Sequence, residues 1–358
     1  MTGSAASPPR RIRVLIADDS AVMRSVLRMV LETSPWLEIA ATASSGEEAV
    51  TEFDRTRPDL VLLDIEMPGL NGLDALSAIR KRSRRTPVIM CSTLTWHGAR
   101  TTLEALSRGA TDYVAKPAAQ KGFREAVGTL ARDLIPKISA LFAQPAAATT
   151  APRLILPAAN PATPRVIVIG VSTGGPVALE RLLPKLPAAF PVPILIVQHM
   201  PHLFTGLLAE RLNALCAVRV REAVAAVAPE PGVVEIARGD WHLELTRDFR
   251  LQLNQREPEN FCRPSADVLF RSAAAATAGR LLGVVLTGMG SDGLAGCRAI
   301  RAAGGTVYAQ DSATSVIWGM PGAVANAGLA NRVLPLDALA QELVRAVSPA
   351  PLTEAAAV

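Results

Sequence analysis

Three polar residues in the second half of the chain each follow an apolar run and carry side chains that can hydrolyse an acyl bond. They are Ser172, His199 and Asp292, which come after the runs at 166–171, 194–198 and 281–287. A hydroxyl nucleophile, an imidazole that takes its proton and a carboxylate that orients the imidazole are the parts of a catalytic triad. Because the carboxyl ends of parallel strands meet at one edge of a sheet, we expect the three side chains to converge there.

The turn that carries Ser172 reads GVSTGGP over residues 170–176 and is compatible with two kinds of chemistry. A glycine-rich turn between a strand and a helix can cradle a phosphate, or it can present a serine as a nucleophile. The turn lacks the GxGxxG spacing and the lysine of common nucleotide cradles, and it is not the GxSxG turn of many hydrolases. The chain order Ser, His, Asp also differs from the order Ser, Asp, His of many α/β hydrolases. Taken singly, His199 could be a structural histidine and Asp292 a turn residue, but their joint placement at strand ends favours the triad.

Polar residues follow the apolar runs of the first half in the same way. Asp18 and Asp19 end the first run, Asp64 the third, Ser92 the fourth and Lys116 the fifth. Three clustered carboxylates repel one another unless a hard cation is bound, and Mg²⁺ suits carboxylate and water ligands. Each aspartate could instead simply cap the helix that follows it. The convergence of all five groups favours a magnesium-dependent site for a phosphoryl group.

The elements that must position these residues are short β-rich runs that alternate with helical patterns in both halves. This alternation predicts an α/β fold with two parallel sheets, each covered by helices on both faces. Residues 144–164 are rich in Pro, Ala and Thr and poor in charge, which indicates a semi-extended linker. Residues 218–253 have turn signals between alternating runs and predict a β-hairpin insertion in the second domain. We therefore predict domains at residues 11–130 and 165–348, joined by a linker at 131–164.

The composition is typical of a soluble two-domain protein and does not indicate a nucleic-acid partner. The 358 residues exceed the usual size of one domain, and 49% of them are hydrophobic, enough for two cores. The net charge of +5 is too small to indicate nucleic-acid binding. The four cysteines show no CxxC spacing, which argues against a zinc site or a disulfide framework and fits a reducing compartment. The chain shows no signal peptide and no apolar window near the ~18 residues that a membrane span needs, so we expect a cytoplasmic protein without membrane insertion.

The first half resembles the receiver domain of bacterial two-component response regulators. The matching motifs are VLIADDS at 14–20, LDIEMPGLNG at 63–72, a serine after the fourth run and DYVAKP at 112–117. The resemblance implies a doubly wound, flavodoxin-like sheet with Asp64 as the phosphoacceptor, which a chemotaxis histidine kinase would phosphorylate. It also implies a Mg²⁺ site and a set of switch residues. The Mg²⁺ site would be formed by Asp18, Asp19, Asp64 and the backbone carbonyl of Glu66, and the switch residues would be Ser92, Tyr113 and Lys116.

The second half resembles the catalytic domain of chemotaxis protein-glutamate methylesterases. The resemblance rests on VIVIGVSTGGP at 166–176, VQHMPHLFTGLLAERL at 197–212, CRPSADVLF at 262–270, GVVLTGMGSDGLAG at 283–296 and GMPGAV at 319–324. It implies a doubly wound, Rossmann-like sheet with Ser172 as nucleophile, His199 as base and Asp292 as orienting acid. The backbone amides of Thr173 and Met289 would form the oxyanion hole, and the esterase reaction would need no cofactor.

The same resemblance implies the substrates and the control of the enzyme. Family members hydrolyse methyl esters of glutamates on the cytoplasmic helices of chemoreceptors, and many also deamidate receptor glutamines. With the receiver in front, we expect a phosphorylation-regulated esterase in which the receiver covers the catalytic edge until Asp64 is phosphorylated. The rival hypotheses are a non-catalytic signalling adaptor and a nucleotide-dependent transferase that uses the glycine-rich turn.

Two neighbouring positions bear on how closely the chain follows the family pattern. Many family members have His before Arg-Pro-Ser, where this chain has Cys262, so the role of that histidine does not carry over directly. Arg263 remains, and it could bind acidic groups on a receptor helix or pair within the fold. The sequence leaves both alternatives open.

Overall fold

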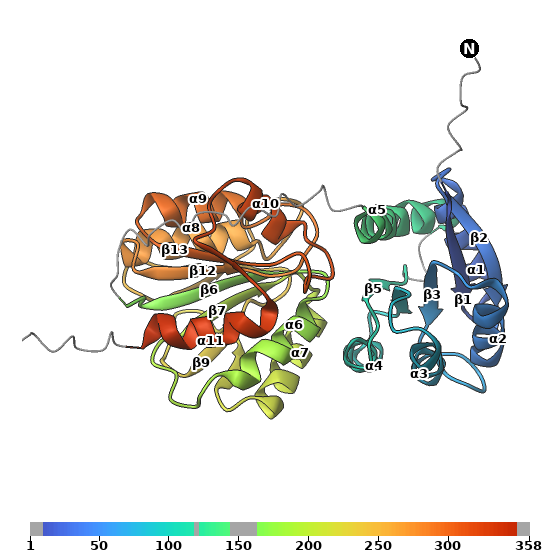
Figure 1. Cartoon of the computed structure of the whole chain (residues 1–358), viewed down its shortest axis with the longest axis horizontal. Helices are drawn as coiled ribbons and strands as arrows, with labels where there is room; N and C mark the ends of the chain where they lie inside the picture. The colour runs from blue at the N-terminus through green and yellow to red at the C-terminus, as the bar shows by residue number, and fades with distance from the viewer. Residues whose placement is uncertain (1–9, 118–121, 144–162, 349–358) are drawn as a thin grey trace, which may run out of the picture. The chain divides into compact units, whose positions relative to one another are not determined.

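The computed structural model of the chain describes residues 10–117, 122–143 and 163–348. The chain divides into two compact units, Met1–Ala143 and Gln144–Val358, and each has a parallel sheet between two layers of helices (Figure 1). None of the helices in the described ranges is long and apolar enough to cross a membrane. The linker predicted at 131–164 lies partly outside the described residues, and its first part, up to Phe142, continues a helix of the first unit.

The first unit contains a five-stranded parallel sheet in the order β2-β1-β3-β4-β5, which is the flavodoxin-like order. Helices α1 and α5 pack together on one face of this sheet, and α2, α3 and α4 follow one another along the other face. The strands are β1 (Ile12–Ala17), β2 (Leu37–Ala43), β3 (Leu60–Asp64), β4 (Val88–Ser92) and β5 (Asp112–Ala115). The helices are α1 (Ala21–Glu32), α2 (Gly46–Thr56), α3 (Gly72–Arg82), α4 (Trp96–Ser107) and α5 (Phe123–Phe142).

Polar side chains begin most helices of the first unit. Ser20, Ser45, Asn71 and Thr95 each accept a hydrogen bond from the backbone N–H three residues further on. Such caps satisfy N–H groups that have no partner within the helix. Because Ser20 caps α1, the simple capping role considered for Asp19 is not what the structure shows.

The second unit contains a seven-stranded parallel sheet in the order β14-β13-β12-β6-β7-β9-β8. Helices α8, α9 and α10 lie on one face of this sheet, and α6, α7 and α11 lie on the other (Figure 1). The strands are β6 (Val166–Val171), β7 (Ile194–Gln198), β8 (Arg219–Glu222), β9 (Val233–Ile236), β12 (Leu281–Val285), β13 (Thr306–Gln310) and β14 (Arg332–Leu334). The helices are α6 (Gly175–Leu182), the short 3-10 helix η1 (Leu183–Lys185), α7 (His202–Leu215), α8 (Ala266–Thr277), α9 (Leu294–Ala302), α10 (Met320–Asn326) and α11 (Leu336–Val347).

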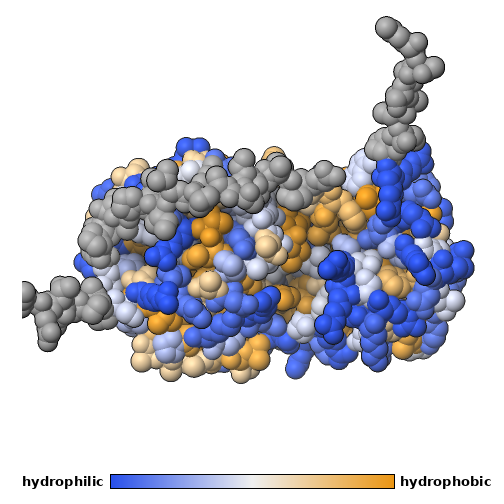
Figure 2. All heavy atoms as spheres, in the orientation of Figure 1, coloured by the Kyte–Doolittle hydropathy of each residue, from blue (hydrophilic) through white to orange (hydrophobic). Residues whose placement is uncertain are grey.

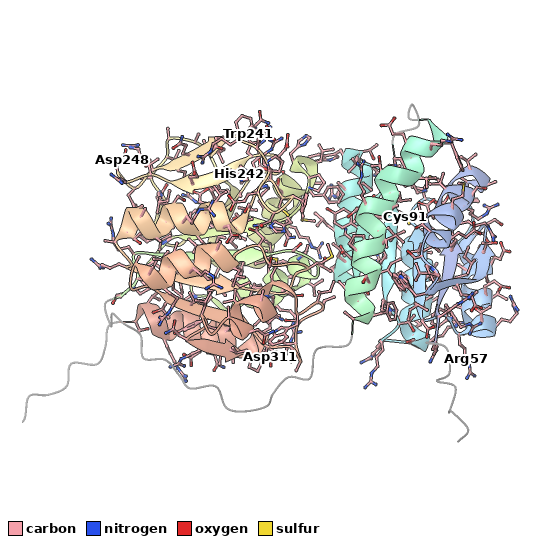
Figure 3. All side chains as sticks on the ribbon, turned by 90° about the horizontal axis from the view of Figure 1, so that it is seen from above. Arg57, Cys91, Trp241, His242, Asp248 and Asp311 are labelled. Atoms are coloured by element: carbon pink, nitrogen blue, oxygen red, sulfur yellow. The ribbon has the colours of Figure 1, made fainter. Side chains whose placement is uncertain are left out.

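The predicted β-hairpin is present but shorter than residues 218–253. Strands β10 (His242–Leu245) and β11 (Leu251–Asn254) form an antiparallel pair apart from the main sheet, whereas β8 and β9 join that sheet as parallel strands. Short alternating runs do not distinguish an outer strand of a sheet from a strand of a hairpin. Figure 3 shows Trp241 and His242 at one end of this hairpin and Asp248 at the other.

Each unit has its own apolar core, and the second core packs tightly beneath its strand ends. Leu269 and Phe270 of α8 are fully buried against the sheet. At Gly170 of β6, an added Cβ would lie 2.7 Å from Ala266 Cβ, so α8 approaches this strand too closely for a side chain there.

On the surface, hydrophilic side chains cover much of the face of the first unit that Figure 2 shows.

Candidate active site

The carboxyl ends of β6 and β7 bring Ser172 and His199 to the same edge of the second sheet. The two strands are parallel neighbours in which Val171 pairs with Gln198, so each candidate residue directly follows a paired position. The His199 N–H donates to Val171 O at 3.1 Å, and the Ser172 N–H donates to Thr287 O at 3.0 Å. Ser172 is therefore attached to the segment after β12 on one side and lies next to the end of β7 on the other.

Asp292 comes to this edge from the loop after β12 and is joined to His199. Asp292 Oδ2 lies 2.8 Å from His199 Nε2, and the Asp292 side chain is 3% exposed. The carboxylate also accepts hydrogen bonds from the Ser265 hydroxyl at 2.7 Å and the Asn260 amide at 2.9 Å. The first two backbone N–H groups of α8 donate to it at 2.6 and 3.1 Å. These donors surround both oxygens and fix the orientation of the carboxylate.

The same contacts set the charges of the pair. Burial raises the pKa of Asp292, but hydrogen bonds from His199 and Ser265 outweigh it, so this pKa lies well below its ordinary value. Burial lowers the pKa of His199, but hydrogen bonds with Asp292 and Cys262 outweigh it and raise this pKa to about 10. The environment therefore favours a carboxylate beside an imidazolium at neutral pH, and His199 can accept a proton only after the ring has lost one.

The second ring nitrogen of His199 faces a cysteine. His199 Nδ1 lies 3.6 Å from Cys262 Sγ. Across the described ranges, no hydrogen bond joins the Ser172 hydroxyl to His199, so only the imidazole–carboxylate half of the predicted chain of hydrogen bonds is formed. Catalytic hydrogen bonds in unliganded enzymes are often long and tighten when substrate binds.

The segments that carry Thr173 and Met289, the two predicted oxyanion donors, lie at this edge as well. Thr287 Oγ1 donates to Thr173 O at 2.9 Å and accepts from the N–H groups of Val316 and Ile317, at 3.1 Å in each case. Thr173 is buried, and Met289 is half-buried in the loop that follows Thr287. The Thr287 hydroxyl therefore ties the turn after β6 to the segment that precedes α10.

Close packing around Ser172 requires glycine at two positions. A Cβ at Gly288 would lie 2.4 Å from Met320 Sδ and 2.8 Å from Ser172 Cβ. A Cβ at Gly175, the first residue of α6, would lie 1.9 Å from Gln198 Oε1. Both glycines allow backbone to pack where a side chain would displace the serine or its neighbours.

The residues that hold Asp292 in place are not evident from the sequence alone. Ser265 belongs to the CRPSADVLF stretch, but its hydrogen bond to Asp292 depends on how the chain before α8 folds. The Ser265 N–H donates to His242 Nδ1 at 3.3 Å, and His242 Nε2 lies 3.1 Å from Glu257 O. The buried His242 thus supports Ser265, which in turn supports the Asp292 carboxylate.

Arg263 pairs within the fold, which is one of the two alternatives that the sequence left open. Its Nε and Nη2 donate to Asp240 Oδ1 at 3.0 and 2.6 Å. Its Nη1 donates to the carbonyl oxygens of Gln255 and Arg256 at 3.1 and 3.0 Å. The guanidinium therefore joins the start of the hairpin to the segment that follows it.

The first unit gathers its acidic residues at the carboxyl end of its sheet. Carboxylate oxygens of Asp18, Asp19 and Asp64 lie within 4.8 Å of one another. Lys116 Nζ lies 2.8 Å from Asp18 Oδ2 and 2.7 Å from Asp64 Oδ2. Burial raises the pKa of Asp64 to about 6, with Lys116 opposing the rise and the charge of Asp18 adding to it. Three carboxylates this close fit a hard divalent cation such as Mg²⁺, which would offset their mutual repulsion.

The remaining residues predicted for the receiver lie on the neighbouring strands and loops. Ser92 is buried at the end of β4, where its hydroxyl accepts a hydrogen bond from Thr102 Oγ1 at 2.7 Å. Tyr113 of β5 is 8% exposed, and Lys137 Nζ lies 5.1 Å from its ring centroid. Glu66 is exposed in the loop after β3. Ser92 and Tyr113 thus lie on the two strands that follow β3 across the sheet.

Comparison with known proteins assigns both units to families. The model of the CheB methylesterase family matches residues 167–343, and the model of the response regulator receiver domain matches residues 14–128. The protein-glutamate methylesterase/protein-glutamine glutaminase of Trichodesmium erythraeum is 46% identical over 349 residues, which cover 94% of this chain and 99% of that protein. The protein of the same name from a Nocardioides species is 49% identical over 348 residues, which cover 93% of this chain and 95% of that protein. The chain belongs to this family.

The likeness extends to the fold of the second unit. The crystal structure of the Thermotoga maritima CheB methylesterase catalytic domain is similar with a TM-score of 0.50 and 40% sequence identity, and the match covers 51% of this chain and 99% of that one. The chain is therefore a hydrolase of the CheB methylesterase family that also carries a response regulator receiver domain. The predicted family membership and the predicted fold of two parallel-sheet units are confirmed.

Proposed function

We propose that this CheB-family hydrolase removes methyl groups from glutamate side chains on the cytoplasmic helices of chemoreceptors. Ser172 is the nucleophile, His199 the general base and Asp292 the acid that orients the base. The observation that carries this assignment is the 2.8 Å contact between His199 Nε2 and the buried Asp292 carboxylate, next to the paired strand end that holds Ser172. The glycine-rich turn lies in the hydrolase unit, so we assign it to the esterase rather than to a nucleotide.

The contact with Asp292 leads us to assign proton transfer to the other ring nitrogen of His199. Because Nε2 is held by the carboxylate, Nδ1 takes the proton from the Ser172 hydroxyl as the oxygen attacks the ester carbonyl. The backbone N–H groups of Thr173 and Met289 stabilise the oxyanion, and His199 returns the proton to the departing methanol. Water then hydrolyses the acyl-enzyme by the same route. A receptor glutamine in the same position would lose ammonia, which requires no further residue.

We also propose that phosphorylation at Asp64 controls the reaction. A receiver domain at residues 11–130 would take the phosphoryl group from a chemotaxis histidine kinase. Mg²⁺ would be held by Asp18, Asp19, Asp64 and the backbone carbonyl of Glu66, and would neutralise charge on the phosphoryl group. Support comes from the close approach of the three carboxylates and from Lys116, which already pairs with two of them. A phosphoryl group would add about −1.5 to −2 charge beside Lys116, and we assign Ser92 and Tyr113 to transmitting that change.

The receiver would control access to the catalytic edge, and the enzyme would act in the cytoplasm. The receiver would cover the catalytic edge of the domain at 165–348 until Asp64 is phosphorylated, with residues 131–164 joining the two. Because the receptor helices and the kinase of such a pathway are cytoplasmic, we propose the same compartment for this enzyme. Arg263 already pairs with Asp240, so we assign it to holding the rim of the site rather than to direct contact with substrate.

Substitution of the nucleophile tests the esterase. Methanol release from a methylated receptor fragment is measured for the wild type and for Ser172→Ala, with Ser291→Ala as a control that removes an exposed hydroxyl in the loop after β12. We expect Ser172→Ala to lower the rate by about 10³-fold or more and to leave receptor binding intact, and Ser291→Ala to keep the wild-type rate. Equal rates for Ser172→Ala and wild type would contradict the role of Ser172, and a wild type that releases no methanol above the uncatalysed rate would favour the non-catalytic adaptor.

A small phosphodonor such as acetyl phosphate tests the control. The rate of the full-length enzyme is expected to rise on addition of the donor, and Asp64→Asn is expected to abolish the rise without lowering the unstimulated rate. Equal rates with and without donor in the wild type would contradict control by phosphorylation and would leave the esterase assignment unaffected.

A further inference from the structure

Cys262 forms a second chemical arrangement with the ring of His199. Its Sγ lies 3.6 Å from Nδ1, and Nε2 of the same ring lies 2.8 Å from Asp292 Oδ2. A thiol, an imidazole and a carboxylate therefore stand in series. An imidazole nitrogen within reach of a cysteine sulfur is an arrangement that activates the sulfur as a nucleophile.

The other three cysteines lie in environments that favour the neutral thiol. Cys91 of β4, seen inside the first unit in Figure 3, and Cys297 of α9 are both buried, and burial raises the pKa of each well above its ordinary value. Cys216 follows α7 and is half-buried, and burial raises its pKa to about 11. In the described ranges, Cys262 differs from these three in its 3.6 Å contact with an imidazole nitrogen.

A tight turn fixes Cys262 beside the ring and leaves it within reach of solvent. Glu259 and Cys262 exchange backbone hydrogen bonds of 3.1 and 2.9 Å around a two-residue turn. The turn residues Asn260 and Phe261 have φ angles of 54° and 62°. The Asn260 side chain donates to Asp292 at 2.9 Å, which ties the turn to the carboxylate that holds His199. Phe261 is fully exposed and Cys262 is half-buried, so the turn that carries the cysteine lies at the surface.

We propose that Cys262 is a modification site for peroxides, at which oxidation of the thiol switches the hydrolase off. The thiolate sulfur attacks the hydroxyl oxygen of a hydroperoxide, so that an S–O bond forms and the O–O bond breaks. The sulfur is oxidised by two electrons, and the leaving oxygen receives the proton of His199 Nδ1 and departs as water or an alcohol. The product is a sulfenic acid, which a thiol reductant converts back to the cysteine.

Oxidation of Cys262 would block the His199 ring nitrogen on which the proposed reaction depends. In the proposed function, Nδ1 is the ring nitrogen that accepts the Ser172 proton, because Nε2 is held by Asp292. The hydroxyl of a sulfenic acid at Cys262 both fills the space beside Nδ1 and can hydrogen-bond to it. The loss of activity therefore rests on the proposed function, whereas the oxidation needs only the contact between Cys262 and His199.

Labelling of the full-length protein tests the reactivity of the thiol. The protein is exposed to hydrogen peroxide in the presence of dimedone, which traps sulfenic acids, and peptide mass spectrometry measures the label at Cys262 and Cys216. We expect Cys262 to be labelled about tenfold faster or more, because the imidazole beside Cys262 activates its sulfur, whereas burial raises the pKa of Cys216. In His199→Gln, which removes the imidazole, labelling of Cys262 is expected to fall towards that of Cys216. Equal labelling of the two cysteines, or unchanged labelling of Cys262 in His199→Gln, overturns the proposal.

The consequence for activity is measured separately. Methanol release is compared before peroxide, after peroxide and after dithiothreitol, for the wild type and for Cys262→Ala, each against its own untreated rate. We expect the wild type to lose most of its activity and to recover it with dithiothreitol, and Cys262→Ala to keep its rate. Equal fractional losses in the two proteins overturn the switch.

Two further readouts keep the outcomes distinct. Thermal denaturation checks that Cys262→Ala is folded, and Cys262→Ser replaces it if it is not. If no untreated protein releases methanol, the proposed function is refuted, and the labelling of wild type and His199→Gln then decides the modification site by itself.

Discussion

Replacement of Asp292 by asparagine should damage both the reaction and the fold, because every donor around this side chain is arranged for a carboxylate. Oδ2 accepts from His199 Nε2 and from the Ala266 N–H, and Oδ1 accepts from Ser265, Asn260 and the N–H that follows Ala266. An amide has one oxygen and one NH₂ group. In either orientation its NH₂ meets a backbone N–H of α8, which cannot reverse its role.

The expected magnitudes follow from that geometry. A buried N–H without an acceptor costs about 1–3 kcal/mol, and loss of the charge beside the His199 ring brings the total to about 3–5 kcal/mol of the free energy of unfolding. The rate should fall by about 10³–10⁴-fold, because the imidazole loses the carboxylate that orients it and stabilises its protonated form. Methanol release under single-turnover conditions and urea denaturation of the same preparations measure the two effects.

Asp267→Asn is the matched control, since it makes the same change on the adjacent buried acid. Asp267 accepts from the Gly296 N–H at 2.5 Å and from Asn260 at 2.8 Å, and no hydrogen bond among the described residues joins it to His199. Burial raises the pKa of Asp267, so its charge is less favoured by the fold than that of Asp292, and its neutralisation should cost less stability. We expect its rate to stay within about threefold of wild type, as for a residue outside the reacting groups. A tenfold or smaller rate loss in Asp292→Asn, or an equal loss in both variants, would refute the role of the His199–Asp292 contact.

Three further outcomes are expected. Only the neutral His199 ring accepts a proton and the pKa of the ring is raised, so kcat/KM should rise with pH through that pKa once the background hydrolysis measured with Ser172→Ala is subtracted. Cys262→Ala removes one group that raises this pKa and should move the rise in kcat/KM to lower pH, and an unmoved pH profile would contradict the coupling of Cys262 to His199. Gly288→Ala would place its Cβ 2.8 Å from Ser172 Cβ. We expect this substitution to lower the rate of methanol release by about tenfold or more and the free energy of unfolding by about 1–3 kcal/mol, and a wild-type rate and melting curve would be inconsistent with this packing. Removal of Mg²⁺ with EDTA should prevent labelling of Asp64 by acetyl phosphate and leave the unstimulated esterase rate unchanged, and labelling that persists without the metal would count against the proposed metal site.

The sequence predicts most of the fold because strand ends and glycine-rich turns are local signals. Each apolar run that precedes Asp64, Ser172 or His199 is a strand in the structure. The side chains that surround Asp292 are different, because Asn260 and Ser265 reach it through a turn with positive φ angles and through the start of α8. Such contacts depend on the long-range arrangement of loops, for which a single sequence carries no periodic signal.

The contact between Cys262 and His199 belongs to the same category. In the sequence, Cys262 only departs from the family pattern, and no role for it follows. The residues between Cys262 and His199 do not reveal how far apart the two side chains lie in space. In the structure, the turn at 259–262 places Cys262 Sγ 3.6 Å from His199 Nδ1. The pairing of Arg263 with Asp240 and the entry of β8 and β9 into the main sheet are likewise decided by packing.

The chain order Ser, His, Asp, which in the sequence counted against a hydrolase, follows from the order of the strands. β6 lies between β12 and β7, and the chain visits β6, then β7 on one side, and much later β12 on the other. A nucleophile at the end of the central strand can therefore meet a base from one neighbour and an acid from the other, whichever neighbour comes first in the sequence. These residues come to one edge because three parallel strands end there, beside the point where the strand order of the sheet reverses. A triad needs its three side chains at one place, and this need sets no order for them along the chain.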